Sequence, residues 1–199
     1  MSETEIPLFP LRTVLYPEGP LPLRIFETRY LDMISRCLRE DSGFGVVLIR
    51  EGTETGPAST CGTGTLAKIV DWYQGSDGLL GITAQGSERF RVESVRQAPD
   101  GLNLARVSWL PPEPRVDLPA AFRPMVDILR SVLDDLGRLY ELLERRYDDA
   151  TWVGYRFAEI LPITPEQKQF CLETEDALQR LEIIRVILRS AQDAEEDDG

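Results

Sequence analysis

Histidine is absent from the 199 residues of this chain. Its absence excludes Ser-His and Cys-His nucleophilic pairs, histidine general bases and histidine-bearing zinc sites. Cysteine is scarce as well, because Cys37, Cys61 and Cys171 lie far apart and are odd in number. That pattern argues against a disulfide framework and against a CxxC metal site. We therefore expect three reduced thiols that serve packing, and neither a metal site nor a cofactor.

Long apolar runs and an excess of positive charge are also missing. No segment approaches the roughly 18 apolar residues that a membrane span requires, and residues 1–5 lack the basic-then-apolar layout of a signal peptide. The formal net charge is −12, whereas nucleic acids and anionic membrane surfaces both select basic patches. These absences predict a cytoplasmic protein with no membrane partner and no nucleic-acid partner.

Catalytic motifs are equally hard to find. The chain has no GxxxxGK[ST] phosphate loop, and its Gly62-Thr63-Gly64 stretch leads into a strand pattern without a helix behind it. The adjacent carboxylates Asp134 and Asp135 fit a helix surface better than an acid/base pair. No serine–lysine dyad can be identified. The sequence therefore predicts a protein that is not an enzyme.

The stretch from Ile6 to Tyr30 organises the expected fold. Two short apolar runs, 6–11 and 20–23, flank a turn signal at 16–19, and both runs carry proline at alternate positions. Because proline cannot donate to a ladder, these runs are predicted to be edge or bulged strands, not a sheet centre. From Tyr30 the apolar residues follow a helical period. That helix is predicted to end at 41–43, with Gly43 in the left-handed cap conformation.

Further along, short β-rich segments alternate with turn signals. Strands are expected at 44–49, 64–73, 79–84, 89–95 and 102–109, with a loop over 50–60 and a turn over 85–87. Strands at this spacing are typical of an all-β sandwich or barrel.

The proline cluster at 111–114 marks the expected domain boundary. We predict a β-domain over 1–112, a helical bundle over 113–192 and a disordered acidic tail over 193–199. Apolar residues at steps of three and four from Phe122 to Leu143 predict one long helix over about 119–147. Asp149 is expected to cap a second helix, and Thr164 with Gln167 predicts a capping box that opens a third. A last helix is expected from about Leu178.

Several short motifs also follow one another in a specific order. They are Pro7-Leu8, Leu11-Arg12, Leu21-Pro22-Leu23, Ile25-Phe26-Glu27, Arg29-Tyr30, Gly86 with Arg89-Phe90, and Leu161-Pro162. Together they resemble the N-terminal substrate-binding domain of Lon proteases, and more closely the stand-alone bacterial Lon-domain proteins that lack ATPase and protease domains. The resemblance implies an α+β fold. Its expected parts are a PUA-like antiparallel β-barrel or pseudo-barrel with one inserted helix, then an all-α bundle with one long helix.

The resemblance also implies recognition of protein substrates. Our first hypothesis is a non-catalytic protein-binding module that acts as an adaptor or chaperone-like factor for unfolded or specific clients. A separate protease or chaperone would be a further partner, and a homodimer stays open. The alternative is an RNA- or nucleotide-binding PUA-like module. The net charge of −12 disfavours it, because phosphate contacts need lysine and arginine on one face.

The candidate peptide-binding residues are Arg12, Phe26, Glu27, Arg29 and Tyr30. A proline-rich strand beside an apolar helix entry leaves unpaired backbone and apolar surface in one place. That combination suits capture of an extended segment, by strand addition or by groove packing. The alternative is that the aromatic residues fill the seam between barrel and helix, with Glu27 and Arg29 tying the two together. In that case Phe26 would be a core residue, whose truncation to alanine costs about 3–5 kcal/mol.

Overall fold

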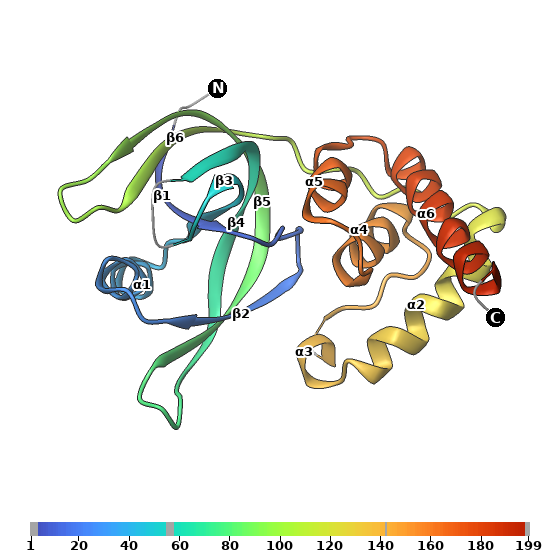
Figure 1. Ribbon diagram of the computed structural model, residues 1–199, viewed down its shortest axis with the longest axis horizontal. Helices are drawn as coiled ribbons and strands as arrows, with labels where there is room; N and C mark the ends of the chain where they lie inside the picture. Colours follow the sequence, from blue (N-terminus) through green and yellow to red (C-terminus); the bar gives the residue numbers. More distant parts are fainter. Residues whose placement is uncertain (1–3, 55–57, 142, 198–199) are drawn as a thin grey trace. The chain divides into compact units, whose positions relative to one another are not determined.

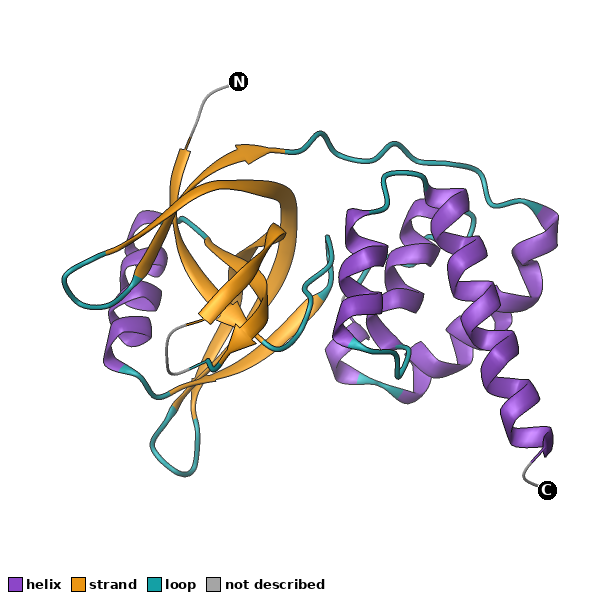
Figure 2. Cartoon of the chain, turned by 45° about the horizontal axis from the view of Figure 1, so that its top comes forward, coloured by secondary structure: helices purple, strands orange, loops and turns teal. Residues whose placement is uncertain are grey.

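A computed structural model describes residues 4–54, 58–141 and 143–197, and the chain divides into two compact units between Pro112 and Glu113. The first unit holds β1 (Thr4–Leu11), β2 (Pro20–Ile25), α1 (Thr28–Glu40), β3 (Phe44–Gly52), β4 (Ala58–Gln74), β5 (Leu80–Gln97) and β6 (Asn103–Trp109). The second is helical (Figures 1 and 2). The predicted α+β class is therefore confirmed.

The strands of the first unit form a closed barrel with one added strand. Their order is β2-β5-β4-β3-β1-β6, and β6 also pairs with β5, which closes a ring of five strands. The β2 strand lies outside that ring and pairs with β5. The pairing of β1 with β3 is parallel, so the expectation of a purely antiparallel barrel was wrong at this point.

The position of β1 also differs from the prediction. It lies between β3 and β6 and is not an edge strand. Its two partners, however, use different halves of it. Residues 4–8 pair with β6 and residues 8–11 pair with β3, so that Leu8 alone has neighbours on both sides. Pro7 and Pro10 therefore each lie where β1 is paired on one side only. A residue without an N–H is tolerated there, because the unpaired side of the strand needs no donor. The second run, β2, is an edge strand as predicted.

The α1 helix packs against the strands (Figure 2). Its buried residues Tyr30, Met33, Ile34 and Cys37 follow the i, i+3, i+4, i+7 spacing of one helix face. They join Phe9, Ile25, Phe44 and Ile82 in the core of the barrel unit. The helix ends at Glu40, next to the predicted end at 41–43. The left-handed residue after it is Asp41 (φ 48°), not Gly43 as predicted.

Two segments that were predicted to be a loop and a turn belong largely to strands in the structure. The β3 strand continues through Gly52 and β4 begins at Ala58, so much of the predicted loop over 50–60 belongs to a hairpin, and 55–57 lie outside the described residues. The predicted turn at 85–87 lies inside the single long strand β5. A glycine is required at position 86 because of close packing, not because of a turn. Its backbone lies directly against the carbonyl of Tyr16, where no side chain fits.

The described residues of the second unit form a 3₁₀ turn, η1 (Ala120–Phe122), and five helices: α2 (Arg123–Asp135), α3 (Arg138–Glu141), α4 (Ala150–Ile160), α5 (Pro165–Glu173) and α6 (Ala177–Asp197). The expected long helix over 119–147 is wrong. Pro124 lies in the first turn of α2, and Gly137 (φ 57°) interrupts the helix after it. The predicted cap at Asp149 and the capping box at Thr164 are confirmed.

Within the segment 193–199 that was expected to be a disordered tail, α6 continues to Asp197, and 198–199 lie outside the described residues; α6 is the longest described helix. Alanine, glutamate and glutamine are strong helix formers, and they continue the helix past the expected end. Cys37, Cys61 and Cys171 are free and buried, which confirms their predicted packing role.

Two arginines lie fully buried inside the helical unit, Arg156 on α4 and Arg180 on α6. The Nε of Arg180 donates to the Cys171 carbonyl (2.9 Å), and its Nη2 donates to Glu113 Oε1 (2.7 Å). Its guanidinium lies 4.1 Å from the centre of the Tyr155 ring. The buried ion pair therefore ties the beginning of this unit to its last helix.

Candidate functional site

A groove of about 390 Å³ opens on the barrel unit between the end of β1, the strand β2 and the start of α1. Its lining is Phe9, Leu11, Arg12, Thr13, the β2 residues 21–25, Phe26, Glu27, Tyr30 and Glu54. The structure thus brings together Arg12, Phe26, Glu27 and Tyr30 from the five residues that the sequence analysis selected. Arg29 lies next to the groove without lining it.

The floor of the groove is aromatic. The rings of Phe9 and Tyr30 stack with their centroids 3.9 Å apart and 15° between their planes, and Phe44 lies 5.9 Å from Phe9. Tyr30 is 4% exposed, and this burial raises the pKa of its phenol. Both β1 and α1 contribute to this stack, so two elements of the core hold the floor in place.

Phe26 stands at the mouth of the groove with 62% of its surface exposed. The expectation that it could be a core residue is therefore wrong. In β2 the alternation of side chains sends Leu21, Leu23 and Ile25 to one face. Phe26 follows the last of them and precedes α1, so neither the strand nor the helix face buries it. A large exposed aromatic side chain beside an apolar groove provides surface that a ligand can cover.

Arg29 lies beside the groove and connects several of the segments that form it. Its Nη2 forms an ion pair with Glu27 Oε2 (2.8 Å), and its Nη1 donates to the Gly101 carbonyl (3.1 Å). The Nη2 also donates to the Glu54 carbonyl (3.4 Å), and the guanidinium lies 4.7 Å from the centre of the Tyr30 ring. This is the tie between helix and barrel that the sequence left as an alternative. It holds Tyr30 and Glu54 in place at the groove.

The charged groups on the rim have partners of their own. The backbone N–H of Arg12 donates to Glu54 Oε1 (2.9 Å), and the Arg12 guanidinium donates to the Gly52 carbonyl (2.7 Å). Arg24 forms an ion pair with Asp77, and Glu27 forms the pair with Arg29. The rim of the groove thus carries two ion-paired charges, Arg24 and Glu27, and two charges that are hydrogen-bonded to backbone groups, Arg12 and Glu54.

Glu54 was not selected from the sequence. Glu54 follows β3, which pairs in parallel with β1, and it contacts Arg12 just after the end of β1, across 42 positions of the chain. No local pattern marks such a contact.

We expect replacement of Arg29 by alanine to lower the free energy of unfolding by about 1–3 kcal/mol, because it removes the half-buried bond to the Gly101 carbonyl, the ion pair with Glu27 and the guanidinium that lies over the Tyr30 ring. Arg12→Ala is the matched control. It removes an exposed guanidinium with one side-chain bond and should cost less than about 1 kcal/mol. Urea unfolding followed by near-UV circular dichroism measures both. Equal losses in the two variants would show that Arg29 does not hold the groove.

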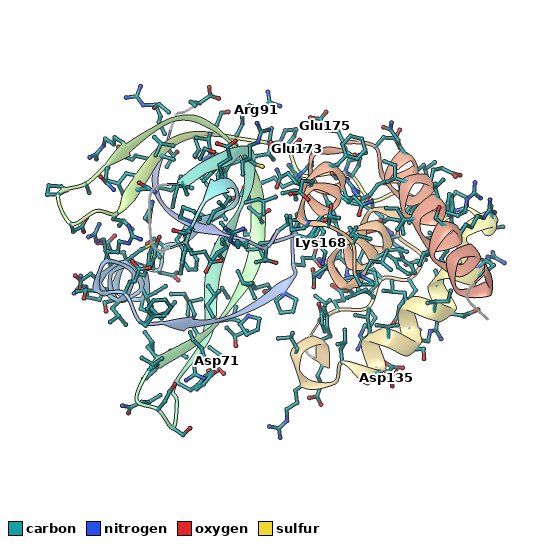
Figure 3. The ribbon with its side chains drawn as sticks, in the orientation of Figure 1. Asp71, Arg91, Asp135, Lys168, Glu173 and Glu175 are labelled. Carbon is teal, nitrogen blue, oxygen red and sulfur yellow. The ribbon has the colours of Figure 1, made fainter. Side chains whose placement is uncertain are left out.

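A second hollow, of about 370 Å³, lies in the helical unit and is lined by Glu113, Pro114, Val116, Thr151 and residues 175–178. Figure 3 labels Glu175 in this unit. The polar groups here already serve the fold, because Glu113 pairs with Arg180 and Asp176 Oδ1 accepts from the N–H groups of Leu178 and Gln179. It contains none of the residues selected from the sequence, so the groove remains the candidate site.

Within the described residues, no helix combines the length and the apolar character that crossing a membrane requires.

Comparison with known proteins identifies relatives over nearly the whole chain. Residues 5–190 match the sequence model of a family described as the ATP-dependent protease La (LON) substrate-binding domain. The crystal structure of a Lon N-terminal domain protein from Xanthomonas campestris is 36% identical, covers 92% of this chain and 98% of that one, and superimposes with a TM-score of 0.76. The N-terminal domain of Mycobacterium avium complex Lon protease, 16% identical over 91% of this chain and 96% of that one, has the same fold (TM-score 0.62).

Among curated proteins, Lon protease 2 of Myxococcus xanthus is 28% identical over 209 residues, which are 92% of this chain and 23% of that protein. The Lon protease of Anaeromyxobacter dehalogenans also has 23% of its length covered. The chain thus spans about a quarter of the curated relatives that it matches.

Proposed function

The chain belongs to the family of LON substrate-binding domains, and from this premise we propose that the groove of its barrel unit binds segments of polypeptide substrates. The observation that supports the proposal most directly is the groove itself. An exposed Phe26, the apolar side of β2 and the stacked Phe9 and Tyr30 rings meet there. A substrate of a protease family is a polypeptide, and apolar side chains are the parts of an unfolded polypeptide that gain most from such a surface.

The expected affinity is modest. Burial of a single large apolar side chain contributes about 1.5–3 kcal/mol, whereas a dissociation constant of 1 μM corresponds to about −8 kcal/mol. One groove of about 390 Å³ has room for few side chains, so a bound segment is released readily. Weak, reversible capture suits a module that presents its substrate to another component.

The proposed role is therefore that of a non-catalytic adaptor or chaperone-like factor for unfolded or specific client proteins. Side chains that line the groove supply apolar contacts and charges held in ion pairs or hydrogen bonds, and among the described residues the lining contains no serine, cysteine, lysine or histidine. Cleavage of a captured client would need a separate protease, which we propose as a partner of this chain.

Replacement of Phe26 by aspartate tests this role. Because the side chain is 62% exposed, we expect the free energy of unfolding to change by less than about 0.5 kcal/mol. Binding of a fluorescein-labelled peptide with a central leucine-phenylalanine-leucine run should weaken about tenfold or more, which is about 1.4 kcal/mol. Fluorescence anisotropy measures the binding and thermal unfolding measures the stability.

The chain provides a matched control for this experiment. Trp72 on β4 is an equally exposed aromatic residue of the same unit (62%), and it does not line the groove. Trp72→Asp should therefore leave peptide binding unchanged. If Phe26→Asp keeps both its stability and its peptide affinity, the groove is not the binding surface.

A further inference from the structure

The free edge of β2 has a defined chemistry, because the pairing with β5 determines which backbone groups point outward. The Gly86 N–H donates to the carbonyl of Gly19 (2.9 Å), so that carbonyl faces β5. Backbone groups alternate along a strand, and the register continues from Pro20 opposite Gln85 to Ile25 opposite Leu80. The backbone groups of 21, 23 and 25 therefore face β5, and those of 20, 22 and 24 face outward.

Two of the three outward-facing residues are prolines. Pro20 and Pro22 have no N–H, so the outer edge presents three carbonyls and only the N–H of Arg24. A β-ladder needs donors and acceptors in alternation along the edge. Prolines placed in this way are a known means of blocking edge-to-edge pairing. Among the described strands β2 has β5 as its one partner, and its open edge cannot complete a second ladder.

The groove lies along this β2 segment. Pro22 belongs to its lining, together with Leu21, Leu23 and Phe26. The strand thus offers the groove its side chains and acceptor carbonyls, but almost no backbone donors. On the rim, Arg24 and Glu27 are engaged in ion pairs, and the Arg12 guanidinium and the Glu54 carboxylate each already form a hydrogen bond with a backbone group.

We propose that a bound polypeptide is read through its side chains and does not add a strand to β2. One or two apolar side chains of the segment enter the groove, while its backbone crosses the mouth beside Phe26 without forming a ladder. The proposal rests on the proposed function and specifies its binding mode. It decides between strand addition and groove packing, the two modes that the sequence left open, in favour of packing.

Backbone substitution in the ligand separates the two modes. The probe is a short fluorescein-labelled peptide with one central phenylalanine in a glycine- and serine-rich frame. In a second version, alternate amides are replaced by esters, which removes their N–H donors and weakens their carbonyl acceptors while keeping every side chain. In a third, the phenylalanine is replaced by alanine. Anisotropy titrations with the full chain compare the three.

The ester peptide is expected to bind within about threefold of the parent peptide, and the alanine peptide about tenfold more weakly or worse. A tenfold loss with the ester peptide would overturn the side-chain mode and establish a ladder. If the parent peptide binds equally well to Phe26→Asp and wild type, the groove assignment fails, and the binding mode fails with it. Binding that depends on Phe26 but is sensitive to the ester overturns this inference alone.

Discussion

Replacement of Arg180 by methionine is expected to lower the free energy of unfolding of the helical unit by about 3–5 kcal/mol, because it leaves a buried carboxylate without its cation. Glu113 has a side chain that is 6% exposed, and Arg180 is fully buried beside it. The substitution also removes the donor to the Cys171 carbonyl. For a small domain, whose total stability is about 5–15 kcal/mol, this is a large fraction. Urea unfolding followed by far-UV circular dichroism measures it.

Two further variants test the cause of that loss. Arg185→Met makes the same replacement five positions along α6, where the ion pair with Glu182 is partly exposed, and should cost less than about 1 kcal/mol. Glu113→Gln in the Arg180→Met background removes the negative charge that Arg180 compensates in the wild type and should recover part of the stability. If the two substitutions add instead of compensating, the carboxylate is not what makes the single variant unstable.

Arg180 also shows where a sequence signal existed and was not used. Ala177, Arg180, Leu181 and Ile184 have the i, i+3, i+4, i+7 spacing of one buried helix face, and Arg180 is the charged member of that set. An arginine in the middle of an apolar stripe predicts a buried ion pair. Its partner Glu113 lies 67 positions away, and no local pattern connects the two.

The strands and α1 could be predicted because periods of two and 3.6 are local properties of the chain. The prediction of one long helix over 119–147 was wrong for the same reason, because it used only the local period. The apolar stripe from Phe122 to Leu143 continues across Gly137, and periodicity does not register a single residue with φ 57°. The pairing of β1 on both sides likewise could not be predicted, because it depends on which halves of the strand β3 and β6 occupy.

The candidate site was predictable to the extent that it is local. Phe26, Glu27 and Tyr30 are almost consecutive, and they adjoin β2 in the sequence as they do in the fold. Glu54 was missed because it comes near Arg12 only through the parallel pairing of β1 with β3, which joins segments far apart in the sequence. The exposure of Phe26 could not be predicted either, since an aromatic residue between two apolar elements is buried or exposed according to how the chain turns between them.

Replacement of Gly86 by alanine should lower the free energy of unfolding of the barrel unit by about 3 kcal/mol, the upper end of the usual range for overpacking. A Cβ at this position would lie 2.0 Å from the Tyr16 carbonyl oxygen and 2.9 Å from its carbon. These are backbone atoms, so no rotamer change can relieve the clash. Tyr16 is fully buried, and its carbonyl accepts from the Gly19 N–H (3.0 Å) in the turn that leads into β2.

That turn is also tied to Gly86 directly, because the Glu18 N–H donates to the Gly86 carbonyl (2.8 Å). Displacing it shifts β2, so we expect Gly86→Ala to weaken peptide binding in the groove as well. Gly62→Ala, the same change in β4, adds a Cβ with nothing within 4 Å and should stay within about 0.5 kcal/mol of wild type. Guanidinium unfolding followed by tryptophan fluorescence compares the two. Equal stability of the two variants would mean that the turn moves freely and that Gly86 does not set the position of β2.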